Sequence, residues 1–200
     1  MSDYKITSDD VKAARNSFEA NEPRDLFYRV TTELVDLALR GATSLTATEA
    51  LAVLQTWNET YYQYCKFDNE HCASIEQLWI QPQSALAGYR HRTIDKLNRA
   101  EQATISTLFQ GFERVLGPVG AAKALHLLAP GLFPLWDRAI ADAYCLTLGQ
   151  AGSNGDRYWR FMLIAKQQCL ELSWQEPGCK NPLKSIDEYN YCKHTKGWLY

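Results

Sequence analysis

The sequence has no apolar run of the roughly 18 to 20 residues that a membrane-spanning helix requires. Its six cysteines include no Cys-x-x-Cys pair, so we do not expect a zinc ribbon or a four-cysteine iron–sulfur cluster. Alternating apolar and polar residues, the pattern of a half-buried strand, are missing over any useful length. These absences argue against a membrane protein, a cysteine-based metal protein and a β-rich fold.

An excess of charge of one sign is also missing. The formal net charge is -2, so the chain as a whole does not attract phosphates or an anionic membrane over long distances. Nucleic-acid binding would therefore need a local patch. The basic residues cluster twice, in Arg90, His91, Arg92, Lys96 and Arg99, and in Lys180, Lys184, Lys193, His194 and Lys196. A solvated helix face is the alternative explanation for each cluster.

The N-terminal residues MSDYKITSDD are polar and acidic and lack the apolar segment of a signal peptide. We therefore expect a cytoplasmic protein whose cysteines are thiols. Cys65, His71 and Cys72 could supply three metal ligands, but a chain of 200 residues buries enough surface to fold without a metal. We expect no metal and no cofactor.

Apolar residues make up 46% of the chain and recur at intervals of three and four, which predicts a core of packed helices. We expect a compact all-α bundle of about eight helices in one domain over residues 1–200, with two lobes and a cleft near 117–144 as the alternative. An irregular tail over 173–200 would pack on the body. The predicted helices cover 8–21, 23–41, 47–66, 73–79, 95–116, 119–129, 136–148, 156–172 and 183–191.

Particular residues carry these helix assignments. Ser8 can cap the first helix, and Thr46 with Glu49 forms a capping box for the third. The second helix shows an apolar stripe, and the helix ending at 116 shows the strongest one; the stripes are Leu26, Val30, Leu34 and Leu37, and Ile105, Leu108, Phe109, Phe112 and Val115. The pair Gly117-Pro118 should break the chain between two helices.

The segment 117–144, GPVGAAKALHLLAPGLFPLWDRAIADAY, contains the most informative polar residues. Helical spacing places Lys123 and His126 together, on the side opposite the apolar stripe of their helix. Asp137 falls at the start of the next helix and beside apolar residues. It can act as an N-cap, or as a half-buried carboxylate with a tuned ionisation, and the two roles are compatible.

Glycines before a short helix, a proline loop and an Asp opening the next helix resemble the helix-hairpin-helix DNA glycosylase superfamily. The residues that carry the likeness are 117–120 and 133–137, and it is closest to the 8-oxoguanine DNA glycosylase branch, which includes small bacterial proteins of this fold. The resemblance covers about 30 of the 200 residues. It implies a helix-hairpin-helix fold and a DNA partner.

The resemblance also implies residue roles. Backbone amides of Gly117, Val119 and Gly120 would hold a DNA phosphate, and Asp137 would support attack at the sugar C1′. A hairpin Lys is the nucleophile of bifunctional members, but Lys123 stands 14 residues before Asp137, and the family places its Lys about four or five residues further upstream. A lyase step by Lys123 is therefore left open.

Hydrolysis of an N-glycosidic bond requires the target base to leave the stack and enter an apolar or aromatic slot. We expect Trp136, Phe133, His126 and Tyr144 to contact substrate. Further aromatic candidates are Trp57, Tyr61 and Trp159, although aromatic residues at helical spacing usually pack in a core.

Three functions remain open from the sequence. The first is a DNA N-glycosylase that hydrolyses the bond to a modified, 8-oxoguanine-like purine with help from Asp137. The second is a non-catalytic helix-hairpin-helix module of a DNA-related or defence system, with a protein partner. The third is a nucleosidase-like salvage protein, which the mild acidity of the chain suits.

Overall fold

The computed structural model of the chain describes residues 4–22, 25–80, 86, 88–175 and 181–199. Over these residues the chain is helical and contains no strand, which confirms the all-α prediction. The elements are α1 (Ser8–Asn21), α2 (Leu26–Leu39), α3 (Ala47–Ala50), η1 (Leu51–Val53), α4 (Leu54–Trp57), α5 (Glu59–Tyr62), α6 (Asn69–Ile80), η2 (Ile94–Lys96), η3 (Arg99–Glu101), α8 (Gln102–Leu128), α9 (Arg138–Ala143), α10 (Gly155–Gln175), α11 (Pro182–Asn190) and η4 (Tyr191–Thr195).

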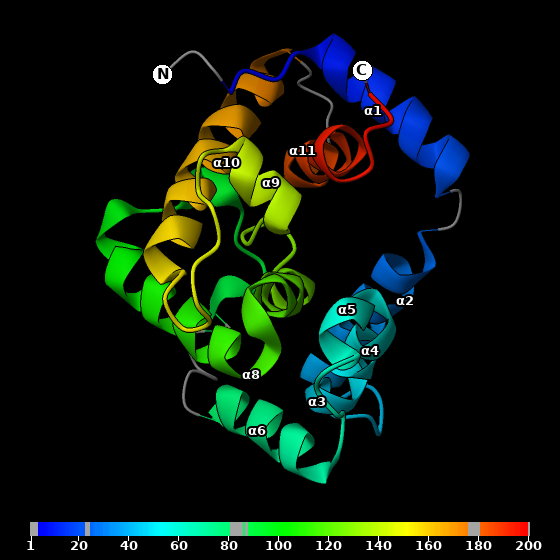
Figure 1. Cartoon of the computed structure of the whole chain (residues 1–200), viewed down its shortest axis with the longest axis vertical. Coiled ribbons are helices and arrows are strands. Elements are labelled where there is room, and N and C mark those ends of the chain that lie inside the picture. The colour runs from blue at the N-terminus through cyan, green and yellow to red at the C-terminus, as the bar shows by residue number, and fades with distance from the viewer. Residues whose placement is uncertain (1–3, 23–24, 81–85, 87, 176–180, 200) are drawn as a thin grey trace.

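The long helix α8 is the element on which the other helices assemble. Helix α10 packs along it on one side, and α2, α4, α5 and α6 contact it on the other (Figure 1). Helix α11 packs against α1 and α10 at one end of the molecule. None of the described helices is both long enough and apolar enough to cross a bilayer.

A sharp break divides α8 into two helical segments. Gly117 has φ 69° and ψ 168°, a conformation that only glycine adopts readily, and Pro118 starts the second segment without losing a hydrogen bond. The predicted break is therefore confirmed, with a helix on each side of it. The first helix begins at Gln102 and not at 95, because Leu97 and Asn98 are extended between the short turns η2 and η3. The apolar stripe of the first segment is buried as predicted, with Phe109 and Phe112 at most 1% exposed.

The core centres on aromatic rings from α8, α10 and the loop before α9. Phe109 stacks on Tyr158 with 4.1 Å between ring centroids, and Trp136 packs edge-on against both rings. The Tyr158 hydroxyl donates to the Pro134 carbonyl. This packing fixes the proline loop, and with it the start of α9, relative to α8.

Two helix predictions near the N-terminus need correction. The cap of α1 is Thr7, which forms a capping box with Asp10, rather than Ser8. In α2 the predicted stripe is wrong, because Leu26 and Val30 are about half exposed, at 53% and 52%. Among the α2 residues whose burial the structure describes, Thr31 and Val35 are the buried ones, one residue further along, so this helix presents both a polar and an apolar side chain to the core.

The predicted helix over 47–66 is interrupted. Its capping box of Thr46 and Glu49 is confirmed, but the chain passes through η1 and breaks again at Asn58, which has φ -123° and ψ 41°. Asn58 is nearly buried, at 9% exposed, and would touch a Cβ placed at Gly120. Packing of Asn58 against α8 favours the non-helical backbone at this residue over a continuous helix.

The predicted helix over 136–148 is also too long, since α9 ends at Ala143. Cys145 adopts a left-handed φ of 55°, and the loop that follows is held by the buried Asn154 side chain. That side chain accepts from the Gly149 amide and donates to the buried Glu113 carboxylate. These hydrogen bonds form only when the chain leaves the helix, so they favour the loop over continuation of α9.

The tail forms the predicted short helix, α11, followed by the π-helical turn η4. It packs back on the body as expected, with Tyr189 5% exposed. Lys184 joins α11 to α2, because its ammonium lies 3.1 Å from the Asp25 carboxylate and 4.3 Å from the centroid of the Tyr28 ring. Residues 176–180 and Tyr200 lie outside the described residues.

The break at Gly117 predicts a large effect of a single methyl group. A Cβ there would lie 3.1 Å from the Tyr61 ring, and the backbone conformation is strained for any other residue. We expect Gly117→Ala to lower the free energy of unfolding by about 1 to 3 kcal/mol in urea titration. The control Gly111→Ala, in regular helix where the Cβ would make only an ordinary van der Waals contact with Leu78 at 3.9 Å, should raise it by about 0.5 to 1 kcal/mol. Equal effects would contradict this account.

Candidate functional site

A cleft of about 650 Å³ lies where the break in α8 faces the segment that carries α4 and α5. Three parts of the chain line it, together with Leu148: residues 56–61 with Tyr64, residues 116–120 with Lys123, and residues 137–139. Its volume is in the range of small-molecule sites. Both Lys123 and Asp137 line this cleft, and so do Gly117, Val119 and Gly120.

Gly117 and Gly120, at the break in α8, let the two walls approach closely. A Cβ at Gly120 would lie 2.9 Å from the Asn58 amide nitrogen, and one at Gly117 would meet the Tyr61 ring. Tyr61 is fixed from the other side, because its hydroxyl donates to the Val115 carbonyl at 2.7 Å. Residues 57–61 are therefore held against residues 115–120 of α8 by specific contacts.

Lys123 is a strongly perturbed basic group of the cleft. Its amine donates to the backbone carbonyl of Trp57, which the helix break at Asn58 leaves available, and it lies 5.1 Å from the centroid of the Trp57 ring. Burial lowers the pKa of Lys123 to about 8, against the opposing effect of Asp137 and Asp187. The amine is thus close to losing its proton at neutral pH.

Asp137 is the N-cap of α9, as its position predicted. Its Oδ1 accepts from the Ile140 amide at 2.9 Å, and its Oδ2 accepts from the Thr195 hydroxyl at 2.6 Å. The side chain is half-buried and still lines the cleft, so capping and exposure to a ligand coexist. Its negative charge also contributes to the electrostatics of Lys123.

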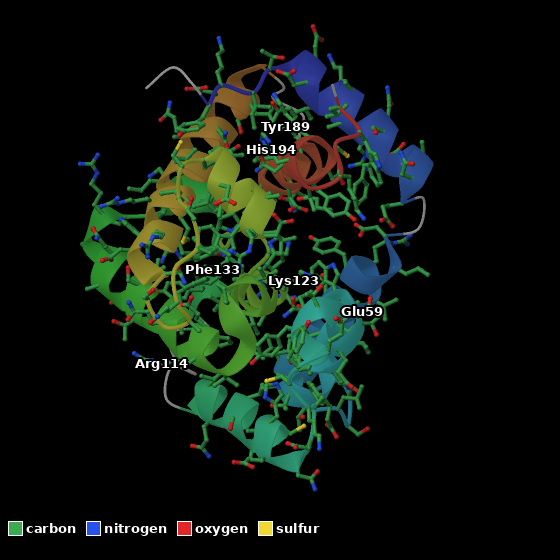
Figure 2. The ribbon with its side chains drawn as sticks, viewed as in Figure 1. Glu59, Arg114, Lys123, Phe133, Tyr189 and His194 are labelled. Carbon is green, nitrogen blue, oxygen red and sulfur yellow. The ribbon has the colours of Figure 1, made fainter. Side chains whose placement is uncertain are left out.

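The rest of the cleft combines aromatic rings with charge. Trp57, Tyr61 and Tyr64 supply the rings, and Tyr64 is 88% exposed. Glu59 and Arg138 add a carboxylate and a guanidinium at exposed positions of the lining. Figure 2 shows Lys123 and Glu59 on facing elements, α8 and α5.

Sequence reasoning missed Glu59, Tyr64 and Arg138 as cleft residues. The signal that could have indicated the first two is the run Asn58-Glu59-Thr60, which interrupts an apolar helical pattern with residues of modest or polar helix preference. Arg138 could have been inferred from its place beside Asp137.

The four predicted substrate contacts lie elsewhere. Trp136, Phe133, His126 and Tyr144 are buried, with exposures of 1%, 0%, 0% and 4%, and none is among the residues that line the cleft. Their rings pack with other core aromatics, as does buried Trp159 within the same hydrophobic cluster. Of the aromatic candidates, Trp57 and Tyr61 are the two at the cleft.

The outward position expected for His126 is wrong, because the face of the second segment of α8 that carries His126 is fully buried. Its Nδ1 lies 2.7 Å from the Phe133 carbonyl, and its Nε2 has no hydrogen-bond partner. Burial lowers the pKa of His126 to about 4, so the imidazole is neutral at physiological pH.

Part of each basic patch is engaged within the protein. In the first, Arg90 donates to the carbonyls that end α8 and pairs with Asp36 at 3.0 Å, and Arg92 pairs with Glu101 at 2.5 Å. These arginines hold structure together and are half-buried. They leave fewer charges for phosphates than the sequence count suggests.

In the second patch, Lys184 is enclosed by carboxylates. Burial alone would lower the pKa of Lys184, but Asp187, Asp25 and Glu188 raise it overall. Lys193 donates to the Tyr189 hydroxyl, and Lys196 lies over the rings of Tyr191 and Trp198. Lys180 lies outside the described residues.

The metal-ligand candidate Cys65, His71 and Cys72 has another explanation. His71 Nε2 lies 3.0 Å from the Tyr62 hydroxyl, within a cluster of aromatic rings. Among the residues that the structure describes, no group of three or more His, Cys, Asp or Glu side chains has an arrangement that could hold a metal ion.

Comparison with protein-family models, with curated proteins and with solved structures finds no match to this chain. The functional interpretation therefore depends on the chemistry of the cleft.

The burial of Lys123 predicts a pH dependence of stability. Because its pKa in the folded protein is below the ordinary 10.5, the unfolded chain binds more protons between about pH 8 and 10.5, and stability rises with pH across that window. We expect Lys123→Met to be at least as stable as the wild type at pH 7, with an advantage that shrinks by pH 10. Urea unfolding at both pH values measures this difference.

The titration itself can be followed by NMR of protein labelled with ¹³Cε-lysine. The resonance that disappears in Lys123→Met should titrate with a midpoint near 8. A midpoint near the ordinary value of 10.5 would show that the amine is not desolvated.

Proposed function

We propose that this protein is a DNA N-glycosylase that removes a modified purine, using Asp137 and Lys123 in the cleft beside the Gly117 hairpin. One observation carries the proposal: a desolvated amine and a fixed carboxylate line the same cleft, beside the break at Gly117. The four buried aromatic and histidine residues of the sequence prediction would then shape the core behind the cleft.

The reaction requires a protein group that stabilises the positive charge that develops on the sugar. When the C1′–N bond breaks, its electron pair leaves with the base, and the sugar becomes oxocarbenium-like before an oxygen or nitrogen nucleophile bonds to C1′. A carboxylate in a partly water-excluded site stabilises that charge or accepts the proton of an attacking water. Asp137 fits this role because the capping and Thr195 contacts hold its carboxylate in one orientation.

Lys123 fits the role of an amine nucleophile. With a pKa of about 8, roughly a tenth of its amines are neutral at pH 7, which is roughly 300-fold more than for a lysine at 10.5. Attack by the amine at C1′, with loss of its proton, would form an imine with the ring-opened sugar once the base has left. The same burial makes Lys123 unsuitable as a simple phosphate contact.

The lining offers surfaces for the other parts of a nucleotide. The rings of Trp57, Tyr61 and Tyr64 can stack on an extruded base, and Arg138 can pair with a phosphate. Glu59 can accept hydrogen bonds from base or sugar.

The internal pairing of several residues of the basic patches favours a second candidate, a nucleosidase-like protein that acts on a free nucleoside. Arg90, Arg92 and Lys184 are unavailable to a duplex, and the net charge is -2. The same two cleft residues would serve this reaction, since the bond to be broken is the same.

The main experiment measures base release from duplexes that carry 8-oxoguanine, uracil or an alkylated base. We expect Asp137→Asn to slow release by about 100-fold or more, because it removes the negative charge beside the sugar. Asp142→Asn, at an exposed position of the same helix, is the matched control and should retain activity. Lys123→Gln should abolish borohydride trapping, whereas Lys96→Gln should not.

Release that survives Asp137→Asn would remove this residue from the mechanism. Absence of release from every substrate would reject the glycosylase and favour a binding module without turnover.

The two enzyme candidates differ in their response to salt. The affinity for a duplex should fall steeply between 50 and 200 mM salt, because the slope of log affinity against log salt is set by the number of phosphate contacts. The affinity for a free nucleoside should hardly change. Fluorescence anisotropy with a labelled duplex and calorimetry with a nucleoside make this comparison. A duplex affinity independent of salt would contradict the glycosylase proposal.

A further inference from the structure

The C-terminal segment reaches the cleft through one contact. Thr195, at the end of η4, donates its hydroxyl hydrogen to Asp137 Oδ2 at 2.6 Å, across 58 residues of sequence. The other carboxylate oxygen is held by the Ile140 amide. We propose that Thr195 is a positioning residue that fixes the Asp137 carboxylate for its reaction, an inference that rests on the proposed function.

The backbone of the tail is built to place Thr195. The π-helical turn is closed by the Lys196 amide donating to the Tyr191 carbonyl at 2.9 Å, and Gly197, with φ 64°, lets the Trp198 amide donate to the Cys192 carbonyl at 2.8 Å. A π-turn shifts the register of side chains by one residue, and such turns are frequent at functional sites. Cys192 is fully buried and anchors the turn in the core.

The chemistry of the contact suits a carboxylate that must remain charged. A hydroxyl donor orients the carboxylate without adding a positive charge, whereas an Arg or Lys partner would neutralise it. The neighbouring His194 ring lies near Tyr144 and Tyr189 (Figure 2). Burial and then Lys193 lower the pKa of His194, with Asp137 opposing, so this imidazole also leaves the carboxylate unpaired by a cation at neutral pH.

The sequence gives no indication of this contact, because Thr195 stands in a segment with no motif in common with 117–144. The contact makes the tail a part of the site as well as a cover for the core. Loss of the hydroxyl should leave Asp137 able to rotate about its side-chain bonds while α9 stays formed through the Ile140 cap.

The test compares Thr195→Val, which keeps the shape and loses the donor, with Thr195→Ser, which keeps the donor. A hydrogen bond to a charged group corresponds to roughly a 10- to 100-fold change in rate. We expect Thr195→Val to slow single-turnover base release by about that factor with unchanged substrate Kd, and Thr195→Ser to restore most of it. The control Lys196→Met alters the packing of the tail on Tyr191 and Trp198 and should leave the rate unchanged.

A second readout does not depend on catalysis. In protein labelled with ¹³C-aspartate, the carboxyl resonance that Asp137→Asn removes should move in Thr195→Val and return in Thr195→Ser. If the wild type releases no base, the proposed function fails, and this resonance still decides whether Thr195 holds the carboxylate. Wild-type rates in Thr195→Val, slow release in both variants, or an unmoved resonance would overturn the assignment.

Discussion

The hydrogen bond from the Lys123 amine to the Trp57 carbonyl depends on two interruptions of helix and on the burial that they create. The break at Asn58 frees the carbonyl, and the break at Gly117 turns α8 so that Lys123 faces it. Tyr61 packs against Gly117 and Asn58 packs against Gly120, and this packing keeps water away from the Lys123 amine. Without either break, Lys123 would be an ordinary solvated lysine.

The same arrangement explains why an acidic and a basic side chain, Asp137 and Lys123, line the same cleft. Packing of the aromatic core fixes the proline loop, the loop places Asp137 at the start of α9, and the tail adds Thr195 from the other side. A carboxylate and an amine whose pKa is lowered to about 8 then share one lining without an ion pair between the two. Such a pair of perturbed or oriented groups in a cleft is the usual mark of a reactive site.

The sequence predicted the features that depend on local rules. The all-α class, the break at Gly117, the capping box at Thr46 and the N-cap role of Asp137 all follow from glycine conformations, proline and short side-chain contacts. These rules act over a few residues and can be applied to a single chain.

Features that depend on tertiary packing could not be predicted in this way. Helical spacing placed His126 outward, but α8 is surrounded on both sides and buries it. The interruption at Asn58 arises from packing on Gly120, and the contact of Thr195 with Asp137 joins segments far apart in the chain. The resemblance to the glycosylase superfamily covers Asp137, but it does not extend to residues 56–64, which form another wall of the cleft.

The most direct test of the account is to locate the reactive amine. The protein is mixed with a duplex that contains an abasic site, the imine is reduced with borohydride, and the cross-linked peptide is identified by mass spectrometry. The account predicts that the DNA-derived mass is attached to Lys123. Attachment to another lysine or to the N-terminal amine, or absence of any adduct, would contradict it.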